Sequence, residues 1–164
     1  MERILDKISE YTVINNIFPG AIFVYMVDML CKIKVQSDSI LIMVFVYYFL
    51  GVVLSRIGSI VVEPILKKCK ILKHAKYEDF VVAEKKDDKI QTLLGVGNMY
   101  RTLIATVVML LLTKGAIEIA KISSSIKFLI IVVSIICLML LLILAYVKQT
   151  NYIRKRVECL NEEG

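Results

Sequence analysis

The longest uncharged segment of the sequence, Phe128–Val147, restricts the fold more than any other feature. It contains twenty consecutive residues without Asp, Glu, Lys or Arg. As an α-helix, which rises about 1.5 Å per residue, it would be roughly 30 Å long and would match the hydrocarbon core of a bilayer. The segment therefore predicts a membrane-spanning helix.

Three further apolar runs follow the same pattern at shorter length: Ser39–Ser55, Thr102–Thr113 and, more weakly, Thr12–Val27. Hydrophobic residues make up 58% of the chain, against about 45–50% in soluble domains. We therefore predict an all-α fold, a four-transmembrane-helix bundle with spans at about 12–31, 39–62, 99–120 and 127–148. Between the hairpins we expect a short cytoplasmic helical region at about 64–98, and after the last span a tail at 149–164.

The distribution of basic residues predicts the orientation of these spans. The connections after the first and third spans carry two and three lysines, whereas the middle connection between residues 67 and 101 carries nine lysines and arginines. Because cytoplasmic segments retain Lys and Arg next to membrane spans, the middle region and both termini are predicted to be cytoplasmic. Four crossings give the same result, which suits a multi-pass protein of the cell inner membrane.

The first span carries two features that bear on its position and use. Pro19 cannot donate a backbone hydrogen bond, so a helix is expected to kink or restart there, and the span can begin near Thr12 or at Pro19. Asp28 lies near the outer end, four residues before Lys32. An acid at this depth is either half of an interfacial ion pair or a pore-mouth acid.

The second span leads into VLSRIGSIVVEPILKK, which places charges at a membrane boundary. Gly51, Ser55 and Ser59 are spaced by four, and small residues on one face let membrane helices approach closely. The helix is expected to end at Glu63–Pro64, because the residue before proline disfavours helix. The candidate pore or gating residues are Gly51, Ser55, Arg56, Ser59, Glu63, Arg101 and Asp28.

Arg101 stands at the cytoplasmic end of the third span, at the depth expected for Glu63. We predict that Glu63 pairs with either Arg101 or Arg56. At the outer end, Lys114 and Glu118 have the i,i+4 spacing of a neutralising pair.

The middle region opens with a lysine cluster that has no acid among its ten residues, KKCKILKHAK. Such a cluster below a span attracts anionic lipid, and it could also hold an anionic signalling ligand. The candidates are Lys67, Lys68, Lys70, Lys73 and Lys76.

Several classes of chemistry find little support in the residues. The four cysteines form no C-x-x-C pair and His74 is the single histidine, so no metal, cofactor or catalytic site is predicted. A voltage sensor repeats arginine along one span, whereas Arg56 stands alone. Nucleic-acid binding by the short basic tail is not expected.

In layout, the chain resembles the small few-span membrane effectors of bacterial anti-phage defence systems. The local patterns SRIGSIVVEP, YEDF and NMYR are similar to those of small bacterial membrane proteins. The resemblance implies a membrane protein that disrupts the inner membrane when a cytoplasmic sensor signals.

We therefore predict a homo-oligomeric, non-enzymatic membrane effector or channel-like protein. It would contact membrane lipids and a cytoplasmic sensor protein or anionic ligand. The alternatives are a membrane anchor or scaffold for a soluble partner and, third, a small-solute transporter that uses Asp28.

Overall fold

The computed structural model describes residues 2–35, 37–72, 76–87, 89–122 and 124–162, and in these ranges the side chains of residues 2–12, 14, 85, 124, 125, 149 and 153–162 lie outside the description. The described chain is helical and contains no strand, which confirms the all-α prediction. The elements are α1 Glu2–Cys31, α2 Ile40–Ile57, the π-helical turn η1 Gly58–Val62, α3 Glu63–Lys68, α4 Tyr77–Lys86, α5 Lys89–Ala120 and α6 Ser124–Glu162.

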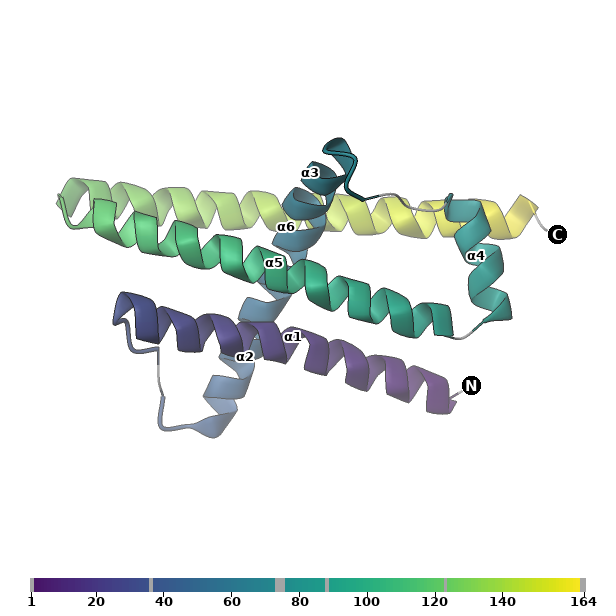
Figure 1. The fold of residues 1–164 in the computed structure, drawn as a ribbon, viewed down its shortest axis with the longest axis horizontal. Helices are drawn as coiled ribbons and strands as arrows, with labels where there is room; N and C mark the ends of the chain where they lie inside the picture. Colours follow the sequence, from purple (N-terminus) through teal and green to yellow (C-terminus); the bar gives the residue numbers. More distant parts are fainter. Residues whose placement is uncertain (1, 36, 73–75, 88, 123, 163–164) are drawn as a thin grey trace.

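Figure 1 shows that α1, α5 and α6 lie along the long axis of the molecule, whereas the continuous rod of α2, η1 and α3 crosses them steeply. The beginning of α1, the end of α6 and the short helix α4 lie at one end of this axis. The connections α1–α2 and α5–α6 lie at the other end. α1 packs mainly on α2 and α5, and α6 is held more loosely, by α5 and the α2–η1 rod.

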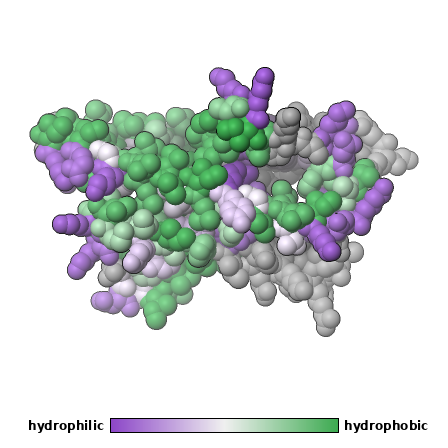
Figure 2. Space-filling model, viewed as in Figure 1, coloured by the Kyte–Doolittle hydropathy of each residue, from purple (hydrophilic) through white to green (hydrophobic). Residues whose placement is uncertain are grey.

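Within the described ranges, three helical segments are long and apolar enough to cross a membrane: Ile40–Lys68, Lys89–Ala120 and Ile126–Tyr152. The apolar part of α1, Asn15–Cys31, is shorter. Many large apolar side chains on these helices face outward, and Figure 2 shows them spread over much of the visible surface. A water-exposed surface of this kind is unfavourable, so the structure indicates an integral membrane protein.

The crossing of α1 and α2 depends on two glycines. A Cβ atom at Gly20 would lie 1.8 Å from the carbonyl oxygen of Tyr47, and one at Gly51 would lie 1.7 Å from that of Asn16. Any side chain at either position would push the helices apart. The close helix approach predicted from the small residues of α2 therefore occurs within one chain, between α2 and α1.

α1 runs without interruption from Glu2 to Cys31, with Pro19 inside it. The expected restart at Pro19 is therefore wrong. Pro19 is fully buried, next to Gly20 at the crossing with α2. Proline is tolerated within membrane helices where neighbouring groups compensate for the missing donor.

The rod that begins with α2 does not end at Glu63–Pro64, contrary to prediction. It continues through α3 to Lys68. There the backbone closes as a Schellman cap, because Lys70 N–H donates to Lys67 O and Ile71 N–H donates to Leu66 O. Lys70 takes the left-handed position of the cap, with φ of 60°. The helix continues past Pro64 because the π turn places that residue in the first turn of α3, where proline is accepted.

Candidate functional site

Glu63 is the centre of an ion-paired cluster that joins three helices. Its side chain is only 7% exposed, and its carboxylate lies 2.7 Å from Arg101 Nη1 on α5 and 2.9 Å from Lys67 Nζ on α3. Lys148 Nζ, on α6, lies 3.6 Å from the same carboxylate. We call Glu63, Lys67, Arg101 and Lys148, together with Ser59, the polar junction. Of the two contacts predicted for Glu63, the structure contains the one with Arg101.

The π turn explains why Ser59 belongs to the polar junction. In η1, Glu63 N–H donates to the carbonyl of Gly58, five residues earlier. In this register, the N–H that would reach the Ser59 carbonyl is that of residue 64, and proline has none. Lys148 Nζ donates to this carbonyl at 2.6 Å and to the Ser59 hydroxyl at 2.7 Å. An ammonium group from α6 thus compensates for the backbone donor that Pro64 removes.

Lys148 is the residue that sequence reasoning missed. In the sequence it is one of several basic residues that follow the last apolar run. Its position directly after the twenty-residue uncharged run places it at the boundary of the last span, at the depth of Glu63. That shared depth was the available signal, but the partner could not be chosen without the helix arrangement.

Arg101 reaches Glu63 over Gly58. A Cβ atom at Gly58 would lie 3.2 Å from Arg101 Cγ and 3.1 Å from the Arg101 carbonyl oxygen, so the glycine makes room for the arginine stem. Arg101 Nε is buried and has no hydrogen-bond partner among the described residues. The guanidinium therefore uses one of its five donors on Glu63, and the others are not engaged by the carboxylate.

Aromatic rings extend the polar junction towards the short helix α4. Lys148 Nζ lies 6.0 Å from the centroid of the Tyr152 ring, within the range of a cation–π contact. The Tyr152 ring is in turn 6.3 Å from the ring of Tyr77, the first residue of α4. Val81, one turn further along α4, is buried. A displacement of α4 would therefore move the Tyr152 ring and change its contact with Lys148.

The remaining candidates of the second span lie earlier on the same rod, Ser55 and Arg56 about two turns before Glu63 and Gly51 about 18 Å before it. Gly51 is buried against α1, whereas Ser55 and Arg56 are partly exposed. Asp28 belongs to the other end of the molecule. Lys114, thirteen residues after Arg101 on α5, donates to the carbonyl of Leu30, which puts the Asp28 end of α1 roughly 20 Å away along α5.

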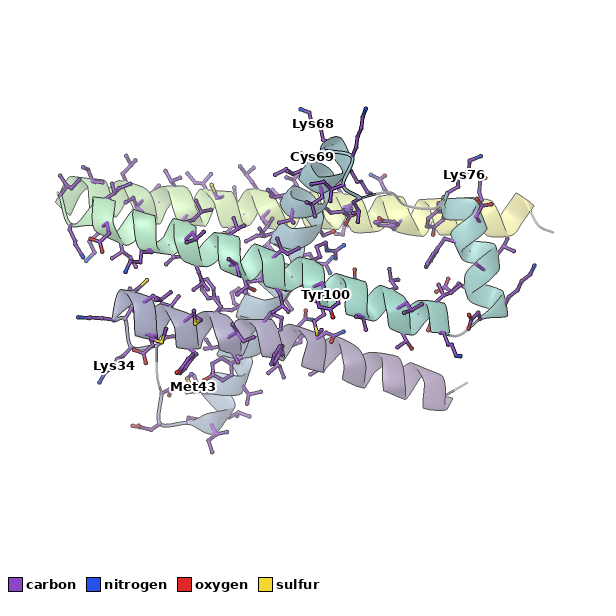
Figure 3. All side chains as sticks on the ribbon, viewed as in Figure 1. Lys34, Met43, Lys68, Cys69, Lys76 and Tyr100 are labelled. Atoms are coloured by element: carbon purple, nitrogen blue, oxygen red, sulfur yellow. The ribbon has the colours of Figure 1, made fainter. Side chains whose placement is uncertain are left out.

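The lysine cluster of the middle region is divided by the structure. Lys67 points back to Glu63, while Lys68, Lys70 and Lys76 are exposed. Figure 3 shows Lys68 at the tip of α3 and Lys76 at the start of α4, both pointing away from the helices. Lys73 lies outside the described residues. Lys68 and Lys70 therefore lie at the end of α3, apart from Lys76 at the start of α4.

A shallow cavity of about 250 Å³ lies at the opposite end, lined by Leu30, Cys31, Lys32, Lys114, Ile117, Glu118 and Lys121. Glu118 pairs with Lys121 at 2.8 Å, and Lys114 donates to Leu30 O. The direct partner of Glu118 is therefore Lys121 and not the predicted Lys114, whose ammonium donates to the end of α1. In the described part of the chain, no three His, Cys, Asp or Glu side chains gather as a metal site would require.

No family model matches the chain, no curated protein is significantly similar to it, and no solved structure is either. The resemblance to anti-phage membrane effectors therefore stays a prediction.

Proposed function

We propose that the protein is an oligomeric, multi-pass membrane effector or channel-like protein that changes the permeability of the inner membrane on a cytoplasmic signal. The observation that carries this proposal is the polar junction, a buried carboxylate at a π turn held by cations from two other helices. Ionisable groups among membrane helices are costly and are usually kept for a function.

The physics of the polar junction suits a switch. A buried ion pair adds little net stability compared with apolar packing, but removal of one partner is strongly destabilising. The contacts of Glu63 with α5 and α6 therefore favour one arrangement of the crossing rod, and a signal that changes them would favour another. π turns within helices are often found at functional positions.

The proposed topology has four crossings, with Asn15–Cys31 of α1 as the fourth and shortest. Support comes from the common position of the start of α1, the end of α6 and α4 at one end of the molecule (Figure 1). That end also carries the exposed Lys76 at the start of α4 (Figure 3), which suits a cytoplasmic location. α4 and the tip of α3 are the surfaces where a sensor protein or an anionic signalling ligand would act.

A vesicle assay tests the permeability function. Wild-type protein and the variant Glu63→Gln are reconstituted into liposomes loaded with a fluorescent dye and potassium. Because the variant loses the charge that holds three helices together, we expect its leak rate to exceed that of the wild type by about tenfold or more, as a shift of about 1.4 kcal/mol would give. Glu118→Gln, which removes an exposed acid on α5, is the matched control and should match the wild type.

The result that contradicts the proposal is equally clear. If wild type, Glu63→Gln and empty liposomes all retain both dye and potassium while both proteins are folded and inserted, the polar junction does not control permeability.

The exposed lysines and α4 favour one alternative, a membrane anchor or scaffold for a soluble partner. Val82 on α4 and Ile71 after α3 are exposed apolar residues beside exposed lysines, as expected of a docking surface. Co-purification of one stoichiometric partner, lost in a variant with altered α4 and unaccompanied by leak, would support this alternative.

A further inference from the structure

The polar junction carries more positive charge than its own acid can balance. Lys67, Arg101 and Lys148 surround Glu63, so these four groups have a net charge of +2. Both carboxylate oxygens are in use, one with Lys67 and the other with Arg101 and Lys148. Among the described residues, Glu63 is the acid that lies within ion-pair distance of Lys67, Arg101 and Lys148.

The three cations also reach the surface. The side chain of Lys67 is 46% exposed, that of Lys148 31% and that of Arg101 22%. Lys148 donates two hydrogen bonds to Ser59 and lies 3.6 Å from the Glu63 carboxylate, whereas Arg101 uses one of its five donors, at Nη1, on Glu63. A guanidinium and an ammonium that converge with free donors are suited to bind the oxygens of a phosphate group.

The depth of the polar junction indicates where the phosphate would come from. Lys148 directly follows the uncharged run of the last span, and Glu63 lies close to the end of the apolar rod that contains α2. This is the level at which lipid headgroups meet membrane helices. Basic pockets between helices on the cytoplasmic side bind anionic lipid headgroups.

We propose that Lys67, Arg101 and Lys148 form a binding site for a phosphate group, occupied by the headgroup phosphodiester of an anionic membrane lipid. Glu63 holds the three cations in place and limits their mutual repulsion. The site takes one headgroup between α3, α5 and α6. This inference does not depend on the permeability function, because an anchor protein would use the same site.

The test measures lipid binding by native mass spectrometry of full-length protein released from mixed micelles. Three probes are compared: phosphatidylglycerol, zwitterionic phosphatidylcholine, and inorganic phosphate added as a competitor. We expect selective retention of one phosphatidylglycerol. The variant Lys67→Gln, which changes the most exposed of the three cations, should weaken this retention by about tenfold, the value of one charge-assisted hydrogen bond, and Lys67→Arg should restore it.

Lys68→Gln is the matched control, because it removes the same charge from the adjacent, exposed residue of α3. Equal losses in Lys67→Gln and Lys68→Gln would overturn the site and leave only a general attraction to positive charge. Equal retention of the two lipids would also overturn it. Displacement of the bound species by millimolar inorganic phosphate, without selective retention of phosphatidylglycerol, would support the phosphate site and overturn the lipid as its occupant.

Discussion

The pairing of Glu63 with Arg101 can be measured by a double-mutant cycle. The variants are Glu63→Gln, which is isosteric, Arg101→Gln, which removes the charge and shortens the side chain, and the double variant. Glutamine substitutions are preferable to charge reversal, because Lys67 and Lys148 also face position 63 and would repel or attract any new charge placed there.

The distances set the expected magnitude. At an effective dielectric constant of about 20, two unit charges 2.7 Å apart attract by roughly 6 kcal/mol and two charges 3.6 Å apart by roughly 4.6 kcal/mol. Desolvation offsets most of this attraction, and removing one partner of a buried pair typically costs about 3–5 kcal/mol. Because Arg101 and Lys148 keep some exposure and can regain water, we expect Glu63→Gln to lower the free energy of unfolding by about 2–3 kcal/mol.

The assay is unfolding by sodium dodecyl sulfate in dodecyl maltoside micelles, followed by far-ultraviolet circular dichroism. The coupling energy between Glu63 and Arg101 should be about 1.5–2.5 kcal/mol. The exposed pair Glu118–Lys121, whose charged atoms lie 2.8 Å apart, is the control and should show little coupling. A coupling below about 0.5 kcal/mol at Glu63–Arg101, with both single variants folded, would refute the structural role assigned to the pair.

Three further predictions follow from the packing. Gly51→Ala should lower the free energy of unfolding by about 1–3 kcal/mol, because its Cβ would overlap the α1 backbone. Gly97→Ala, with open space around it, should raise the free energy of unfolding by about 0.5–1 kcal/mol. The same detergent unfolding measures both variants, and equal effects would contradict the close crossing of α1 and α2. Lys148→Met should cost about 1 kcal/mol less in a Pro64→Ala background than in the wild type, since the restored N–H can satisfy the carbonyl that the lysine now serves; an unchanged cost would show that the lysine does not replace the proline donor. In a variant with Cys69 as the sole cysteine, a membrane-impermeant maleimide should label this residue, which is exposed at the end of α3, in inside-out vesicles. It should leave Cys69 unlabelled in right-side-out vesicles, and the opposite pattern would reverse the proposed orientation.

Much of the secondary structure could be predicted from the sequence, because helix length in a membrane is set by local composition. Runs of uncharged apolar residues indicated the rod that begins with α2 as well as α5 and α6. The errors occurred at prolines. Pro19 and Pro64 each remove one donor, and the sequence pattern could not show that neighbouring elements make this loss tolerable.

The candidate site was predictable in part. The depth argument brought Arg101 and Glu63 to the same level, and the structure contains that pair. It could not select Lys148, since any basic residue at a cytoplasmic boundary has the same pattern. Nor could it assign Gly51 to a contact with α1 within the chain, because a small-residue face looks the same whether its partner is another helix of the chain or another copy.

The sequence by itself determined that the chain is helical and suited to a membrane. A long uncharged apolar segment in a bilayer must satisfy its backbone hydrogen bonds internally, and an α-helix does so. Only the tertiary structure decided how the helices cross and which charges meet. Both depend on contacts between residues far apart in the chain: Gly20 with Tyr47 sets the crossing of α1 and α2, and Ser59 with Lys148 brings α6 to the π turn. Local composition fixes the energy of placing a helix in a bilayer, whereas the pairing of buried charges depends on distances of a few ångströms that only the assembled fold provides.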